Sequence, residues 1–178
     1  MRLFLVRHGQ TEKNRLGMMM GHYDDELNET GIEQVKQTKE LAMKIDYDAI
    51  IASPLKRASQ TADIINYKKL DVIYDERLLE RDMGYLTNAS VHSAVDRGDF
   101  WNLNPAGDYR DAEPMRDMYK RIGEFYEDIK QRYKNKTVLV VTHDGVVRTL
   151  YGYLYGVPES GELLEGRIKN GEVREIVV

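Results

Sequence analysis

Two histidines and two arginines of this sequence stand just after short apolar runs, where polar side chains could do chemistry. The four residues are Arg7, His8, Arg57 and His143. Arginine and histidine side chains together suit an anion, and phosphate matches them best because guanidinium groups bind its oxygens in pairs. The simplest interpretation of these residues is a binding site for one phosphate group.

The histidines could be metal ligands, partners of a serine nucleophile, or nucleophiles themselves. A metal site would need a third ligand, but the remaining His22 and His92 fall in irregular segments and are expected at the surface. The sequence has no Gly-x-Ser-x-Gly, Walker A or Gly-x-Gly-x-x-Gly motif, and it has no cysteine. A histidine is therefore left as the nucleophile that faces phosphate, and we expect neither a metal nor a cofactor.

The apolar runs alternate with longer amphipathic stretches. The runs are residues 3–6, 49–52, 72–74 and 138–141. Each is short, rich in branched side chains and apolar at consecutive positions, which is typical of parallel strands covered on both faces. We expect a three-layer α/β/α sandwich with a mostly parallel central sheet. Since the carboxyl ends of parallel strands meet at one edge, the four polar residues would converge there.

Helical spacing of apolar residues predicts two of the covering helices. The first would carry Ile32, Val35, Ala42 and Ile45 on its buried face, with Asn28 or Thr30 as its cap. The second would begin at Pro114, because proline is tolerated in the first turn, and its apolar stripe extends over residues 115–133.

Two further elements are predicted from local signals. A third helix would have Ser53 as its cap and Pro54 in its first position, which puts Arg57 near the helix N-terminus. Near the end of the sequence, Asn170-Gly171 suits a type I′ turn, and a hairpin there would add an antiparallel C-terminal edge to the sheet. The two strands of this hairpin would be residues 167–169 and 173–178.

The length suits one domain, so we interpret residues 1–178 as a single domain without an internal linker. Residues 85–111 break the alternation, because they are polar and show no sustained periodicity. Two interpretations stay open for this stretch. It is either a plain surface excursion or a short flap over the site, in which Phe100 and Trp101 contact the substrate.

The overall charge limits the possible partners. The chain has 26 Lys and Arg against 30 Asp and Glu, which gives a formal net charge of −4. Nucleic acids and anionic membranes need a surplus of basic residues, and no apolar run is long enough to span a bilayer. We expect a cytoplasmic protein whose partner is a small phosphorylated metabolite, with no nucleic acid or membrane partner. The oligomeric state stays open.

Three segments that contain these residues closely resemble signatures of the histidine phosphatase superfamily, also known as the phosphoglycerate mutase-like family. They are LVRHGQT at residues 5–11, SPLKRASQTA at residues 53–62 and VTHDG at residues 141–145. Residues 27–31 (LNETG) and 79–84 (LERDMG) resemble two further family segments. The segments follow the family's order, so the resemblance covers nearly the whole chain.

The resemblance implies roles for individual residues. His8 would form a covalent phosphohistidine, and Glu80 would donate a proton to the departing alkoxide and then take one from water. Glu80 must be partly protonated near neutral pH for this role, which Arg81 would oppose if it pointed inward. The implied catalytic residues are Arg7, His8, Arg57, Glu80 and His143. The implied substrate-binding residues are Arg7, Asn14, Met20, Gly21, Arg57 and His143.

Three features depart from the family pattern. Asp144 stands where the family often has a small or neutral residue, and it would either repel phosphate or orient His143 or a substrate hydroxyl. Residues 86–88 (LTN) replace the family's usual Glu-Gly continuation. The methionines at residues 18–20 are either apolar filler beneath a loop or part of the substrate lining.

The superfamily contains both phosphatases and mutases. We expect hydrolysis of small phosphomonoesters, because the mutases that resemble this chain carry a longer insertion that closes over the site. In residues 85–111, moreover, only Arg97 and Arg110 could bind a second acidic group of a substrate. Phosphoglycerate mutase-type phosphotransfer is the alternative. A non-catalytic domain that binds a phosphorylated ligand is a third reading, which the intact set of catalytic residues disfavours.

Overall fold

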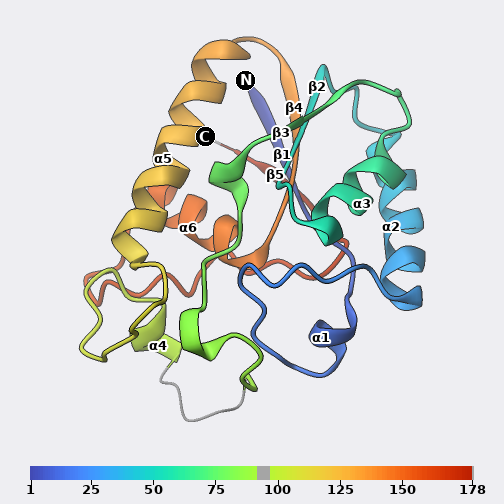
Figure 1. Ribbon diagram of the computed structural model, residues 1–178. Coiled ribbons are helices and arrows are strands. Elements are labelled where there is room, and N and C mark those ends of the chain that lie inside the picture. Colours follow the sequence, from blue (N-terminus) through green and yellow to red (C-terminus); the bar gives the residue numbers. More distant parts are fainter. Residues whose placement is uncertain (92–96, 178) are drawn as a thin grey trace.

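A five-stranded sheet forms the centre of the computed structural model, which describes residues 1–91 and 97–177 (Figure 1). The strands are β1 (Arg2–Arg7), β2 (Ala49–Ala52), β3 (Val72–Tyr74), β4 (Thr137–Thr142) and β5 (Val173–Ile176). They stand in the order β3-β2-β4-β1-β5, with β1 to β4 parallel and β5 antiparallel to β1. The carboxyl ends of β1, β4 and β2 are therefore adjacent, as the sequence predicts.

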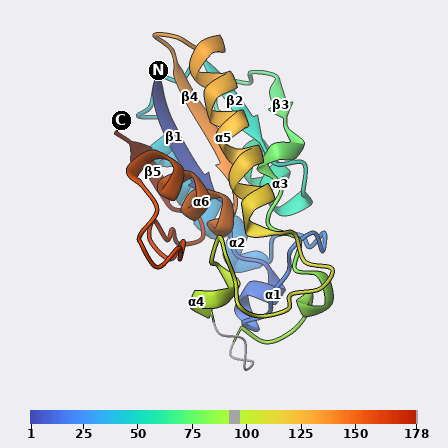
Figure 2. The same cartoon turned by 90° about the vertical axis from the view of Figure 1, so that its left-hand side faces the viewer.

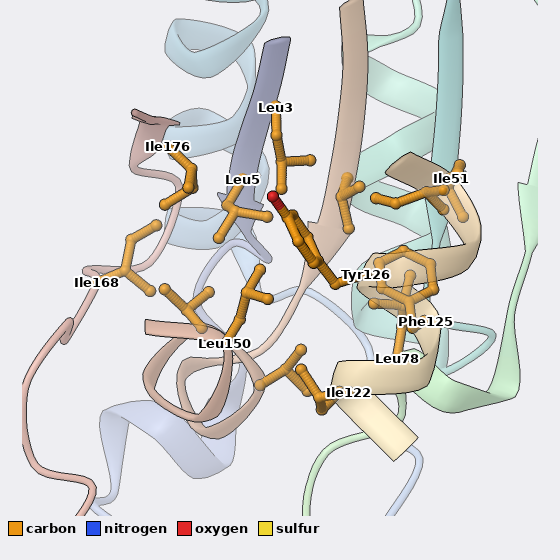
Figure 3. Close-up of a cluster of buried hydrophobic side chains, with 14 of the residues drawn as sticks. Leu3, Leu5, Ile51, Leu78, Ile122, Phe125, Tyr126, Leu150, Ile168 and Ile176 are labelled. Carbon is orange, nitrogen blue, oxygen red and sulfur yellow. The ribbon is translucent and has the colours of Figure 1, made fainter. Parts of the chain in front are cut away.

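Helices cover both faces of this sheet (Figures 1 and 2). The helices α2 (Glu29–Ala42) and α3 (Lys56–Ile65) lie on one face, and α5 (Met115–Arg132) and α6 (Asp144–Tyr155) lie on the other. Leu3 and Leu5 of β1 belong to the core cluster on the α5 and α6 side (Figure 3), whereas Phe4 and Val6 belong to the opposite cluster. The expected three-layer α/β/α sandwich is confirmed.

Shorter helical elements occur in the connections between the strands and the longer helices. They are α1 (Glu12–Arg15), α4 (Arg97–Phe100) and two 3₁₀ turns, η1 (Glu76–Leu78) and η2 (Gly84–Leu86). In Figures 1 and 2, α1 and α4 lie beyond the carboxyl ends of β1 and β4. In the described part of the chain, no helix combines the length and the apolar character needed to cross a membrane.

The helix α2 starts as predicted, but its buried face is turned relative to the prediction. The Asn28 side chain caps it by accepting a hydrogen bond from the backbone N–H of Gly31 at 2.8 Å. Gly31 is on the buried face and packs closely against Gln10. A Cβ at residue 31 would lie only 2.0 Å from the carbonyl oxygen of Gln10, so this position requires glycine. This rotation leaves Ile32 39% exposed, and Ile45 lies beyond the end of the helix, so neither belongs to its buried face.

The starts of the other two helices are predicted with unequal accuracy. The helix α5 begins at Met115, directly after Pro114, close to the expected start. The helix α3 begins at Lys56, and its N-terminus has no side-chain cap. The predictions of Ser53 as the cap and of Pro54 in the first position are wrong, because the N-cap is Leu55 and Pro54 precedes the helix. The Ser53 N–H donates to the carbonyl of Val141 at 3.0 Å, which continues the pairing of β2 with β4. Arg57 is nevertheless the second residue of the helix.

The predicted C-terminal hairpin is also wrong, although the antiparallel edge exists. Residues 167–169 form no strand, and β5 pairs with β1. The backbone N–H of Glu172 does donate to the carbonyl of Lys169 at 3.1 Å, so a turn forms. Its Gly171 has a φ of +73°, but Asn170 is not in the left-handed region, whereas a type I′ turn needs both. The N–H of Gly171 and the side-chain amide of Asn170 are bonded instead to the backbone carbonyls of Arg7, the last residue of β1, and of His8.

Candidate active site

A cavity of about 170 Å³ lies at the carboxyl ends of β1, β4 and β2. Of the residues expected in the site, Arg7, His8, Asn14, Met20, Gly21, Arg57 and Glu80 line it. His143 is next to His8, with the two ring centroids 5.1 Å apart, but it is not among the lining residues. Residues from five separate segments of the sequence are thus gathered at one cavity, seven of them lining it and His143 next to His8.

His8 is buried as a neutral imidazole with a defined tautomer. Its side chain is 2% exposed, and its Nδ1 lies 2.7 Å from the carbonyl oxygen of Gly9. Because a carbonyl only accepts hydrogen bonds, Nδ1 must carry the proton, and Nε2 of the neutral ring keeps its lone pair. Burial, followed by the positive charges of Arg57 and Arg7, holds the pKa of His8 well below its usual 6.5.

The two arginines are held by backbone carbonyls. Arg7 Nη1 donates to the carbonyl of Ile168 at 2.8 Å, and Arg57 donates to the carbonyls of Tyr23 and Gly21 at 2.8 and 2.9 Å. Within the described residues, neither guanidinium forms a salt bridge, and the Nε of each is buried without a partner. Burial lowers the pKa of Arg57 to about 10, so it remains charged at neutral pH. Two fixed positive charges are therefore available to an anion.

His143 is fully buried at the N-terminus of α6. Its Nε2 lies 2.8 Å from Ser53 Oγ, and its Nδ1 has no hydrogen-bond partner in the described part of the chain. Burial and then the charge of Arg57 lower the pKa of His143 well below 6.5. Sequence reasoning placed Ser53 at a helix cap and missed this contact, for which no local signal exists.

Glu80 is a buried carboxyl seated on backbone N–H groups. It is 9% exposed, and its two oxygens accept hydrogen bonds from the N–H groups of Arg81 at 2.9 Å and Gly145 at 3.2 Å. Burial is the largest influence and raises the pKa of Glu80 above 4.5. A Cβ on Gly145 would lie 2.2 Å from Glu80 Oε1, so a glycine is needed beside this carboxyl.

The Arg81 side chain points toward Phe100 and Glu113 rather than toward the Glu80 carboxyl. Its guanidinium donates to the carbonyls of Glu113 and Phe100, with the Glu113 bond at 2.8 Å. The guanidinium carbon also lies 3.9 Å from the centre of the Phe100 ring. Arg81 therefore forms no ion pair with Glu80 and instead links Phe100, within residues 85–111, to Glu113 just before α5.

The loop after β1 supplies one side of the cavity. The Thr11 hydroxyl and the Asn14 amide both donate to the sulfur of Met20, at 3.2 and 3.8 Å. Gly21 has a φ of +51°, and its carbonyl is one of the two that hold Arg57. All three methionines of residues 18–20 line the cavity, so their position fits a substrate lining better than filler.

Other lining residues come from segments that sequence reasoning used little or missed. Phe100 and Trp101, expected as contact residues, do line the cavity, whereas His92 lies outside the described residues. The missed lining residues are Met83, Val91, Arg148 and Arg167. His22 is exposed as expected, but its Nε2 also lies 2.9 Å from the Glu80 carbonyl.

Asp144 lines the cavity, but both oxygens of its carboxylate accept hydrogen bonds from other protein groups. Arg148 Nε donates to one oxygen at 3.0 Å, and the Ile168 N–H donates to the other at 3.0 Å. Arg148 stands one helical turn after Asp144, a spacing that could have revealed the pair in the sequence. Asp144 makes no hydrogen bond to His143 in the described structure, so of the alternatives considered it does not orient that ring directly.

The fold and the site together define an enzyme of the phosphoryl-transfer class. The family model of the histidine phosphatase superfamily (branch 1) matches residues 3–178, and the chain belongs to this superfamily. Phosphoserine phosphatase 1 from Hydrogenobacter thermophilus is 34% identical over 165 residues, which cover 89% of this chain and 78% of that protein. A probable phosphoglycerate mutase from Enterobacter sp. is 33% identical over 168 residues, covering 91% and 78%.

Solved structures agree with this assignment. A mycobacterial glucosyl-3-phosphoglycerate phosphatase, determined in complex with VO3, superposes with a TM-score of 0.84 at 26% identity. The match covers 98% of this chain and 91% of that structure. The expected family is confirmed, and so is the expected enzyme class, a histidine-dependent phosphomonoesterase.

Proposed function

We propose that this protein hydrolyses small phosphomonoesters through a phosphohistidine intermediate on His8. The observation that carries the proposal is the state of His8, a neutral ring with a free Nε2 lone pair beside two guanidinium groups that no carboxylate neutralises by direct contact. Such a ring is a nucleophile for phosphorus. The positive charges favour both the bound phosphate and the charge that develops on its oxygens.

In the first step, Arg7, Arg57 and His143 bind the phosphoryl oxygens and His8 Nε2 attacks phosphorus. The bond from phosphorus to the ester oxygen breaks, and that oxygen takes the proton of Glu80 as the alcohol leaves. In the second step, Glu80 accepts a proton from a water that attacks the phosphohistidine. Inorganic phosphate then leaves, and both His8 and Glu80 return to their starting forms.

The same proposal covers the surroundings of the site. Asn14, Met20 and Gly21 would frame the substrate, since all three line the cavity. Residues 1–178 would act as one domain, with residues 85–111 as a short flap that brings Phe100 and Trp101 to the cavity. We further propose a cytoplasmic enzyme that needs no metal, because two guanidinium groups already supply the positive charge that a phosphate dianion requires.

Mutase-type phosphotransfer is a second candidate, because a further arginine, Arg167, lines the cavity with an exposed side chain and could meet a second acidic group. Phosphoglycerate offered with and without a bisphosphoglycerate separates the two activities. Release of inorganic phosphate supports the hydrolase, whereas isomerisation that depends on the bisphosphoglycerate supports the mutase.

The variant His8→Ala tests the proposed mechanism. We expect turnover of phosphomonoesters to fall at least about 10³-fold, because the nucleophile is lost, and the acid-labile phosphoenzyme to disappear. Binding of inorganic phosphate, measured by calorimetry, should persist since Arg7 and Arg57 remain, and it serves as the control for an intact site. Turnover within tenfold of the wild type would rule out the phosphohistidine.

A further inference from the structure

The turn that precedes β5 is bonded to the backbone that carries the nucleophile. The Gly171 N–H donates to the carbonyls of Arg7 and His8 at 3.0 and 3.3 Å. Asn170 Nδ2 donates to the same carbonyl of His8 at 3.0 Å. The His8 carbonyl therefore accepts hydrogen bonds from both residues of the turn, which restrict rotation of the backbone on which the imidazole stands.

This turn is itself anchored on two sides. The Thr38 hydroxyl of α2 donates to the Gly171 carbonyl at 2.6 Å. Asn170 Nδ2 also reaches Asn14 Oδ1 at 3.2 Å, so the turn is connected to the loop that lines the cavity. A Cβ on residue 171 would come within 3.1 Å of Thr38 Oγ1, so a glycine allows the turn to approach α2 this closely.

A second connection leads from α6 to the guanidinium of Arg7. Asp144 Oδ1 accepts the N–H of Ile168 at 3.0 Å, and the carbonyl of Ile168 accepts Arg7 Nη1 at 2.8 Å. The Ile168 side chain is 2% exposed and belongs to the core cluster drawn in Figure 3. The backbone of the buried Ile168 thus links the Asp144 carboxylate to the Arg7 guanidinium.

The cavity-facing carboxylate needs an explanation, because a bare negative charge there would repel phosphate. Arg148 pairs with it at 2.9 Å, and only 7% of the Arg148 side chain is exposed, so a neighbouring guanidinium offsets much of this charge. What remains is the ability of Asp144 to accept the N–H of Ile168. This is a structural use that a small or neutral aliphatic residue could not provide.

We propose that residues 168–171, held by Asp144, are a positioning element that fixes Arg7 and the backbone of His8 for phosphoryl transfer. Asp144 and Asn170 are positioning residues in this scheme, since they act through Ile168 and through the His8 carbonyl. The inference deepens the proposed function and rests on it for the role of His8.

The test compares two double variants of equal charge, Asp144→Asn/Arg148→Met and Asp144→Ala/Arg148→Met. Both remove the ion pair, but only asparagine keeps an oxygen that can accept the Ile168 N–H. We expect the asparagine variant to bind orthovanadate, a mimic of pentavalent phosphorus, at least about tenfold more tightly in calorimetry. Equal affinities within twofold would overturn the role of Asp144.

Asp48 offers a matched control at the other end of β4. Its carboxylate also accepts one backbone N–H, from Thr137 at 2.8 Å, and one cation, Lys136 at 2.8 Å. Asp48→Ala should lower the melting temperature relative to Asp48→Asn without changing vanadate affinity. If the Asp48 pair also differed in vanadate affinity, the effect at Asp144 would reflect general destabilisation, and the proposal would fail.

Asn170→Ala tests the second connection independently. The variant should lower kcat about tenfold with KM within twofold, because the substrate still meets the same guanidinium groups while the nucleophile is less well aimed. An unchanged kcat would overturn the role of the turn. Vanadate binding requires no turnover, so a wild type that binds vanadate without hydrolysing esters would contradict the proposed function and leave the comparison at Asp144 interpretable.

Discussion

The cavity has two unlike sides. The side that we call the cradle is polar and stands at the ends of β1, β2 and β4. It consists of the lining residues Arg7, His8 and Arg57, together with His143, which contacts His8 without lining the cavity itself. The side that we call the wall is mainly apolar and comes from irregular segments and α4, and it consists of Met18, Met19, Met83, Phe100 and Trp101. Fixed hydrogen bonds to backbone and side-chain groups hold the cradle, whereas thioethers and aromatic rings in van der Waals contact form the wall.

This difference matches the two parts of a phosphomonoester. The phosphate group is common to every such substrate and needs charges that are already in place. The alcohol part varies, and flexible thioethers adapt to different shapes. Changes in the cradle should therefore affect all substrates alike, whereas changes in the wall should alter the preference among them.

The largest effect is expected in the cradle, from Arg57→Ala. Loss of this guanidinium should lower kcat/KM about 10³-fold for phenyl phosphate and for glycerol phosphate alike, because the phosphate loses one of its two fixed positive charges. Arg57→Lys should recover little, since lysine cannot donate in the same plane to the Gly21 and Tyr23 carbonyls and to phosphate. A change of more than threefold in the ratio of kcat/KM for the two substrates would contradict the assignment of the cradle to phosphate alone.

The next effect concerns the proton on Glu80, which lies between the two sides. At the usual values of 6.5 for imidazole and 4.5 for carboxyl, few molecules would combine a neutral His8 with a protonated Glu80. Burial lowers the pKa of His8 and raises the pKa of Glu80. The negative charge of Asp144 raises the pKa of Glu80 further, while the positive charge of Arg57 lowers it. His8 is active above its pKa and Glu80 below its pKa, so both shifts widen the pH window of activity.

Glu80→Gln should remove the alkaline limb of the pH profile for an alkyl phosphate, because no carboxyl is left to lose its proton. The rate on this poor leaving group should fall about 10²-fold or more, while 4-nitrophenyl phosphate, whose leaving group needs no proton, should lose less than about tenfold. Profiles of kcat for the two substrates check this. Equal losses on both, or an unchanged alkaline limb, would speak against the proton-transfer role.

The cradle could be predicted from the sequence because its residues lie next to short apolar runs, and the edge where parallel strands end is the same for all of them. The strand ends brought Arg7 and His143 together without knowledge of the strand order. The hydrogen bonds around them could not be predicted. Local signals predict Ser53 as a helix cap, yet it contacts His143, because the pairing of β2 with β4 extends one residue further than the apolar run.

The wall was harder to predict, since its members come from distant segments without periodicity. Arg167 carries no signal in the sequence that links it to the cavity, and Met83 lies within the family-like segment of residues 79–84, where nothing marks it as a lining residue. The error at Asn170 is of the same kind. Its neighbour Gly171 correctly indicated a turn, but a turn motif does not specify which carbonyls its donors reach, and these proved to belong to Arg7 and His8.

The smallest effect is expected in the wall, from Met19→Gln. Replacing a thioether by an amide should lower kcat/KM for phenyl phosphate about fivefold and leave glycerol phosphate nearly unchanged, because only the aromatic alcohol gains from apolar contact. Met43→Gln is the matched control, since Met43 is 58% exposed and does not line the cavity. If Met19→Gln lowered both substrates equally, the methionine would support the cradle instead, and the two sides could not be assigned separately to phosphate and alcohol.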